Sequence, residues 1–201
     1  MSSSSRQTRE VATRVVYWGP RGSGKTETLR AVFDRVDPST RGPLLTPADE
    51  QDRTLFMDFL TVELGALDGV SLRLHLVGLP GGDALSESSQ ALLRGADGFV
   101  FVADSSPDRQ ADNRAALESL RRHLVASGET LRPVILQFNR RDHPEAVPAE
   151  AMAAELSPSA ESDGWFETVA TSGSGVIETL TAVASRVVGN LSAAAGERSG
   201  T

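Results

Sequence analysis

The chain of 201 residues contains no cysteine, and this absence excludes several kinds of chemistry. Without a thiol there is no disulfide framework, no thiolate nucleophile, no metal site built on sulfur and no acceptor for prenyl or palmitoyl groups. Basic residues are also in deficit, since 20 Lys and Arg stand against 27 Asp and Glu for a formal net charge of −7. Nucleic acid is therefore not an expected partner, because such binding needs clustered cations.

Long apolar runs are missing as well. The longest one, residues 98–103, falls far short of the ~18–20 residues that a membrane span requires. The first residues lack the apolar stretch of a secretory signal, and Ser2 is not the glycine that N-myristoylation uses. We therefore expect a cytoplasmic protein with no integral membrane association.

The length suits one globular domain with loose ends. Residues 1–12 are expected to form a disordered lead and residues 192–201 a disordered tail, because both segments are small and polar. Between them, residues 13–191 alternate short β-branched or aromatic runs with helical stretches. This alternation is typical of the α/β class, in which helices cover both faces of a mostly parallel sheet.

The pattern predicts six strands and five helices. The second and third strands are separated only by residues 65–69, so an antiparallel hairpin is the economical connection. Two irregular segments, residues 37–53 and 78–83, are rich in Pro or Gly; the first is long enough to be a candidate switch loop. The expected strands are 14–18, 54–64, 70–77, 98–103, 134–138 and 166–170, and the expected helices are 25–36, 88–94, 108–127, 148–156 and 175–191.

Residues 19–26 read Gly-Pro-Arg-Gly-Ser-Gly-Lys-Thr and match the Gly-x4-Gly-Lys-Ser/Thr phosphate-binding loop. Glycines let backbone N–H groups surround phosphate oxygens, Lys25 neutralises charge on the β- and γ-phosphates, and Thr26 offers a hydroxyl to Mg²⁺. The helix that begins here adds the positive end of its dipole. A plain glycine turn is the alternative, but the position between a strand and a helix favours nucleotide binding.

A second motif follows the strand at 134–138. The carboxylate of Asp142, three residues after Asn139, can accept hydrogen bonds from two donors that guanine has and adenine lacks, which would select GTP. The same spacing is common in helix-capping turns, so spacing alone leaves both interpretations open. Residues 171–173 could donate backbone N–H groups to the same base, although Thr-Ser-Gly is usually only a turn.

With these motifs the chain resembles the Ras-like small GTPases, and within them the bacterial polarity and gliding-motility branch typified by MglA. The resemblance implies a P-loop NTPase fold of three layers, with a six-stranded, mostly parallel sheet and one antiparallel edge strand. It also implies GTP or GDP with Mg²⁺ as ligands, and a roadblock-type activator and effector proteins as partners. It covers about residues 15–188 and is most specific in residues 19–26, 52–60, 79–81, 97–105 and 137–142.

The resemblance assigns the loop that ends at Thr54 to the first switch, where Thr54 would sense the γ-phosphate through Mg²⁺. Arg53 then resembles a built-in arginine finger, with a surface arginine in a flexible loop as the alternative. Asp58 on the next strand could hold a Mg²⁺-bound water. The expected catalytic residues are Arg53, Lys25 and Thr54, and the expected metal ligands are Thr26 and Thr54. The expected nucleotide-binding residues are Gly19, Arg21, Gly22, Ser23, Gly24, Lys25, Thr26, Glu27, Gly81, Asn139, Arg140, Asp142, Thr171, Ser172 and Gly173.

Two departures from the family pattern bear on activity. The second switch has Gly82 in place of the water-orienting glutamine, so GTP hydrolysis is expected to be slow and activator-dependent. Gly78 also offers no carboxylate to Mg²⁺, at a position where this branch already lacks the usual Asp. Arg140 replaces the usual lysine of the base motif, and its wide guanidinium is expected to loosen affinity. The leading hypothesis is a GTP-dependent switch in cell polarity or motility. The alternatives are a nucleotide-binding scaffold with negligible turnover and an ATP-dependent kinase or ATPase, which the base motif disfavours.

Overall fold

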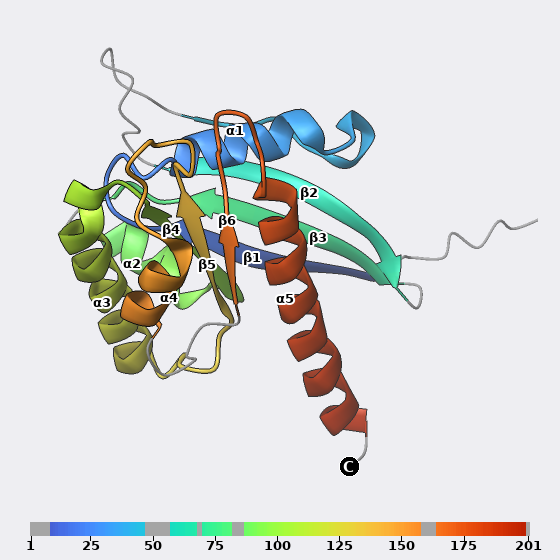
Figure 1. The fold of residues 1–201 in the computed structure, drawn as a ribbon. Coiled ribbons are helices and arrows are strands. Elements are labelled where there is room, and N and C mark those ends of the chain that lie inside the picture. Colours follow the sequence, from blue (N-terminus) through green and yellow to red (C-terminus); the bar gives the residue numbers. More distant parts are fainter. Residues whose placement is uncertain (1–8, 47–56, 68–69, 82–86, 158–163, 200–201) are drawn as a thin grey trace, which may run out of the picture.

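Six strands form one sheet in the order β2-β3-β1-β4-β5-β6 in the computed structural model (Figure 1). The structure describes residues 9–46, 57–67, 70–81, 87–157 and 164–199. The strands are β1 (Arg9–Trp18), β2 (Asp58–Leu67), β3 (Val70–Gly78), β4 (Gly98–Asp104), β5 (Val134–Asn139) and β6 (Trp165–Glu167). All neighbouring pairs are parallel except β2 and β3, which form the expected antiparallel hairpin at one edge of the sheet.

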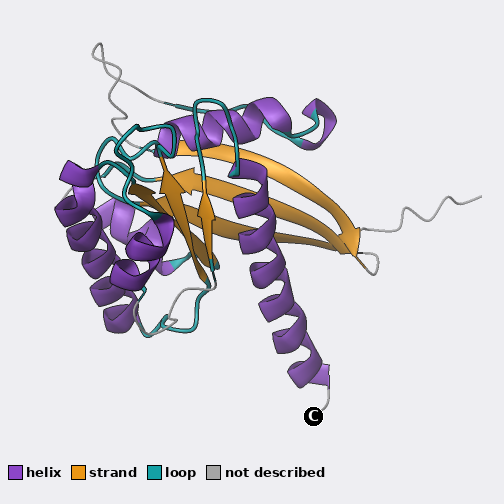
Figure 2. Ribbon diagram, in the orientation of Figure 1, coloured by secondary structure: helices purple, strands orange, loops and turns teal. Residues whose placement is uncertain are grey.

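Helices cover both faces of the sheet (Figure 2). Helices α1 (Lys25–Arg35) and α5 (Val176–Ser199) contribute to one apolar core. Helices α2 (Glu87–Arg94), α3 (Gln110–Ser127) and α4 (Ala149–Leu156) contribute to the other. Two short 3₁₀ turns, η1 (Pro38–Thr40) and η2 (Pro107–Arg109), precede β2 and α3. The fold therefore has the three layers that the sequence predicts.

Strand β1 shows why both faces must be covered. Successive side chains of a strand point to opposite faces, and here Val15 and Tyr17 enter one core while Val16 and Trp18 enter the other. All four are almost completely buried, at 0–1% exposure. A strand that is apolar on both sides can only lie in the middle of a helix-covered sheet.

Regular structure reaches into both segments that were expected to be disordered. Strand β1 begins at Arg9, because residues 9–12 pair with residues 70–73 of β3. Helix α5 continues to Ser199, through three consecutive alanines, which have the highest helix propensity. Residues 1–8 and 200–201 lie outside the described residues. None of the described helices combines the length and the apolar character needed to cross a membrane.

The carboxyl ends of the central strands meet at one edge of the sheet. The strand register places Tyr17 beside Gly78 and Asp104 beside Asn139. In sheets of this kind, ligands bind outside the carboxyl ends of the strands. The loop at residues 19–24, which follows β1, lies at this edge.

Candidate nucleotide-binding site

The loop between β1 and α1 fits closely against its neighbours because of two glycines. Gly19 and Gly24 have φ angles of +152° and +98°, which side chains rarely adopt. A Cβ at Gly19 would also collide with the carbonyl oxygen of Val102 in β4, and one at Gly24 would collide with the amide nitrogen of Asn139 in β5. The loop backbone can therefore lie against the ends of β4 and β5 only with glycine at these positions.

Lys25 is the first residue of α1 and the sole lysine in the chain. Its Nζ donates hydrogen bonds to the carbonyl oxygens of Gly19 at 3.0 Å and Pro20 at 2.7 Å. Burial lowers the pKa of this amine to about 8, and the nearby charge of Asp58 acts in the opposite direction. Carbonyl oxygens solvate the ammonium but carry no charge that neutralises it, so a phosphate oxygen would be a stronger partner.

Thr26 and Asp58 form a second polar pair at the start of α1. The Thr26 hydroxyl donates to Oδ2 of Asp58 at 2.7 Å, and Asp58 is only 2% exposed. The other carboxylate oxygen, Oδ1, is buried and has no hydrogen-bond partner among the described residues. Hydroxyl and carboxylate oxygens are the ligands that Mg²⁺ prefers, either directly or through water. Both residues therefore fit a site for this ion, although the described residues contain no cluster of three or more His, Asp or Glu side chains that could hold a metal.

A cavity of about 400 Å³ opens beside the loop, at the ends of β5 and β6. It brings together six of the residues that the sequence assigns to nucleotide binding. Asp142 is exposed there, and no described residue hydrogen-bonds to its carboxylate, which leaves both oxygens available to a base. The cavity is lined by Gly24, Glu27, Asn139, Arg140, Asp142, His143, Pro144, Val169, Ala170 and Thr171.

Asn139 joins the phosphate loop to the segment after β6. Its Nδ2 donates to the carbonyl oxygen of Ser23 at 2.8 Å. Its Oδ1 accepts from the backbone N–H of Ala170 at 2.9 Å and from the hydroxyl of Thr168 at 3.1 Å. Since Asn139 is only 3% exposed, its main role in this structure is to hold the two loops together.

Arg140 makes a similar link through its guanidinium. Its Nη2 donates to the carbonyl oxygen of Gly22 at 2.9 Å, and its Nε lies 3.3 Å from Oδ2 of Asp104. Asp104 is almost fully buried, and its Oδ1 accepts from the N–H of Ser106 at 3.0 Å. The sequence gives no signal for this ion pair beyond a carboxylate at the end of a buried strand. The pair orients Arg140 across the loop.

Of residues 171–173, which the sequence assigns to the base, only one lines the cavity. Thr171 lines the cavity, whereas Ser172 and Gly173 do not. Their N–H groups are donated inside the turn, to Val169 and, for Gly173, also to Ala170. The Ser172 carbonyl accepts from Arg35 of α1, a contact that no sequence pattern indicated. The idea that Ser172 and Gly173 donate to a base stays a prediction, which these bonds do not support.

The switch segments are described only at their edges. Arg53, Thr54 and Gly82 lie outside the described residues. Gly81 is buried and packs so closely on the backbone of Arg21 that any side chain at position 81 would collide with it. The segment after β3 thus contacts the phosphate loop directly.

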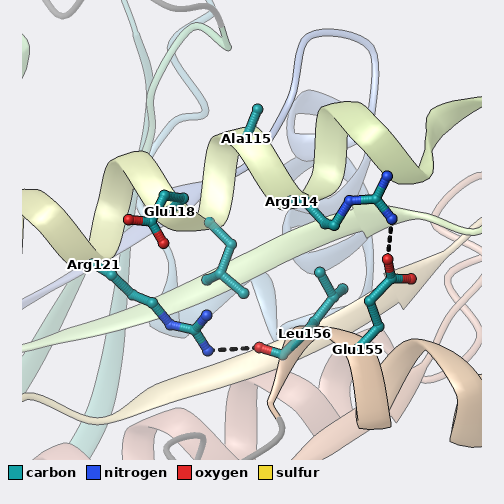
Figure 3. Close-up of a pocket in the computed structure, with 7 residues that line it drawn as sticks. Arg114, Ala115, Glu118, Arg121, Glu155 and Leu156 are labelled. Atoms are coloured by element: carbon teal, nitrogen blue, oxygen red, sulfur yellow. Dashed lines mark hydrogen bonds and ion pairs between the residues drawn. The ribbon is translucent and has the colours of Figure 1, made fainter.

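A second cavity, of about 380 Å³, lies between α3 and α4 and contains none of the predicted site residues (Figure 3). Arg114 is paired with Glu155 across it, and Arg121 donates to the carbonyl oxygen of Leu156 at 2.6 Å. These arginines attach α3 to α4, so this cavity is separate from the nucleotide site in both position and chemistry.

The phosphate loop, its buried lysine and the base-sized cavity at the carboxyl edge of a parallel sheet define a P-loop nucleotide-binding protein. The chain is 40% identical over 185 residues to the Mutual gliding-motility protein MglA of Myxococcus xanthus (strain DK1622), a match that covers 91% of this chain and 94% of that protein. No protein-family model matches the chain. The extent of the match to MglA is sufficient to place this protein in the MglA family of small GTPases.

Proposed function

We propose that the protein binds GTP and GDP with Mg²⁺ in the cytoplasm and hydrolyses GTP slowly, as a switch in gliding motility or cell polarity. The observation that supports this most directly is the buried ammonium of Lys25, held by two carbonyl oxygens of the phosphate loop. The similarity to the mutual gliding-motility protein of Myxococcus xanthus supports the motility role.

The loop would bind phosphates by exchanging partners. Lys25 leaves the carbonyl oxygens of Gly19 and Pro20 for phosphate oxygens, and the N-terminal N–H groups of α1 point at the same anion. Thr26 and Asp58 would hold Mg²⁺, with Thr54 as the further ligand that the family likeness implies. The ion, when bound, neutralises charge on the β- and γ-phosphate oxygens.

Base selection would depend on the cavity at the end of β5. The exposed carboxylate of Asp142 accepts the two donors of guanine, while the stem of Arg140 packs against the base and ribose. Because adenine lacks those donors, ATP leaves the carboxylate unpaired and binds more weakly. This chemistry disfavours the kinase or ATPase interpretation.

Hydrolysis would rely on Arg53 as a cation supplied by the chain itself, since position 82 carries no glutamine to orient water. Because intrinsic GTP hydrolysis is slow, an activator protein can increase its rate. The family likeness names the class of partner, a roadblock-type activator, with effector proteins that contact the switch segments in the GTP-bound form.

Single-turnover GTP hydrolysis, combined with binding of GTP, GDP and ATP, tests the proposal. We expect binding of both guanine nucleotides at micromolar protein, weaker ATP binding, and a slow rate that falls about tenfold or more in Arg53→Ala. Arg122→Ala, which removes an exposed arginine on α3, serves as the matched control. Absence of guanine-nucleotide binding by folded protein would refute the proposal. A rate near zero that Arg53→Ala leaves unchanged would favour the scaffold instead.

A further inference from the structure

Arg21, the third residue of the phosphate loop, lies at the far side of the loop from the base cavity. Gly24 lines that cavity and the carbonyl of Gly22 accepts from Arg140 beside it, whereas Arg21 is not among the residues that line the cavity. Instead, the backbone of Arg21 lies against Gly81 of the segment after β3. A nucleotide with its base in the cavity and its phosphates along the loop would therefore have its last phosphate nearest to Arg21.

The backbone at Arg21 is held from a second direction. Arg109, the last residue of η2, donates from Nη2 to the carbonyl oxygen of Arg21 at 2.6 Å. The same Nη2 lies 3.1 Å from Oδ2 of Asp112, which orients the guanidinium. Arg109 and Gly81 thus fix the position from which the exposed Arg21 side chain extends.

Among the charged side chains around Arg21, the positive charge of Arg21 itself is not balanced by any described carboxylate. Arg109 is paired with Asp112, and the Asp58 carboxylate accepts from Thr26. Arg21, by contrast, forms no ion pair with any carboxylate that the structure describes. The charges of Arg21 and Arg109 also contribute, after burial, to the lowered pKa of Lys25, so all three cations lie within electrostatic range. Such a cluster favours a ligand with several negative charges.

We propose that Arg21 contacts the terminal phosphate of a bound nucleoside triphosphate and makes the site prefer triphosphate over diphosphate, with Arg109 as the residue that positions it. This inference rests on the proposed function of the loop. An exposed arginine that contacts the phosphate equally in the bound state and in the transition state strengthens binding without changing the rate of the chemical step. Arg21 is therefore a specificity residue, which raises the share of the protein that holds triphosphate rather than diphosphate.

The test compares the dissociation constants of GDP and of a non-hydrolysable GTP analogue, both with Mg²⁺. In Arg21→Ala we expect the preference for triphosphate to fall about tenfold while GDP affinity stays within about twofold. Arg21→Lys should keep part of the preference because it keeps the charge. Arg122→Ala, an exposed arginine of α3, should leave both constants unchanged. The difference between wild type and Arg21→Ala should shrink as KCl rises, since Arg21 is exposed.

A double-mutant cycle tests the positioning role. Arg109→Ala should reduce the same preference, and the loss should not add to that of Arg21→Ala if Arg109 acts through Arg21. An unchanged preference in Arg21→Ala, or an equal loss of affinity for both nucleotides, overturns the proposal while nucleotide binding itself stands. Failure of the wild-type protein to bind either nucleotide overturns the proposed function and this inference together.

Discussion

Asp58 of β2 and Gly78 of β3 face each other across the antiparallel hairpin, and the Asp58 carboxylate occupies the space beside Gly78. A Cβ at Gly78 would lie 3.0 Å from Oδ2 of Asp58 and 3.0 Å from Cδ1 of Leu29. The same Oδ2 accepts from Thr26. The general Ras-like pattern, from which the MglA branch already departs, has a carboxylate at the end of β3; here the neighbouring strand supplies one next to the Thr26 hydroxyl.

Asp58→Asn is expected to weaken the Mg²⁺-dependent part of GTP affinity by about tenfold or more. The amide keeps the shape of the side chain and can still accept from Thr26, but it removes the negative charge that favours a divalent cation. The measurement is the dissociation constant for GTP with Mg²⁺ and with EDTA. Asp34→Asn, an exposed position on α1, is the control. Equal weakening with and without Mg²⁺ would show that Asp58 acts only on the fold.

Gly78→Asp is expected to destabilise the protein, by about 2 kcal/mol or more at pH 7. The new Cβ crowds Asp58 and Leu29, and a second carboxylate repels the first. Repulsion raises the pKa of one carboxyl in the folded state, so the loss should diminish as the pH falls towards 5. Urea unfolding at both pH values measures this. Gly78→Ala gives the steric part alone and should show no such pH dependence; if it does, the repulsion argument is wrong.

The lowered pKa of Lys25 predicts opposite pH dependences for folding and for binding. In the unfolded chain the amine titrates near its ordinary value of 10.5, whereas burial lowers its pKa to about 8 in the folded protein. Between these values the unfolded chain binds more protons, so the stability of the nucleotide-free protein contributed by this group rises with pH above 8. Phosphate prefers the charged amine, so nucleotide affinity should fall by up to about tenfold per pH unit over the same range.

Since Lys25 is the sole lysine, amine-selective acetylation followed by mass spectrometry reports on it directly. The rate of modification should rise with a midpoint near pH 8 in the nucleotide-free protein and should drop sharply when GDP is bound. The α-amino group, which lies on a different peptide, is the internal control. A midpoint near the ordinary value of 10.5 would mean that Lys25 is more hydrated than its burial suggests.

The elements that local patterns specify were predictable from the sequence. The spacing of the glycines predicts a tight loop between a strand and a helix, and the predicted strands 54–64 and 70–77, with five residues between them, predict an antiparallel hairpin. Both of these local structures were confirmed. Contacts between distant segments were not predictable. The Asp104–Arg140 pair depends on β4 and β5 being neighbours, and the extension of β1 to Arg9 depends on β3 offering a free edge.

Asn139 illustrates the same limit within the predicted site. Its place at the end of the strand made it an expected nucleotide-binding residue, but the tertiary structure directs its amide to Ser23, Thr168 and Ala170. Asn139→Ala removes these partners at once and leaves the buried Ser23 carbonyl and Ala170 N–H without them. Each such loss costs about 1–3 kcal/mol, so we expect the free energy of unfolding to fall by about 3 kcal/mol.

The same substitution should weaken GTP and GDP binding to a similar degree, because it loosens both the phosphate loop and the loop after β6. Urea unfolding and nucleotide titration of the same preparation measure the two effects. Asn190→Ala, at an exposed position of α5, is the control and should change neither. If Asn139→Ala left stability unchanged but selectively reduced guanine over adenine binding, Asn139 would be a base-recognition residue instead. The parallel loss of stability and of affinity for both nucleotides is what a residue joining two loops must produce.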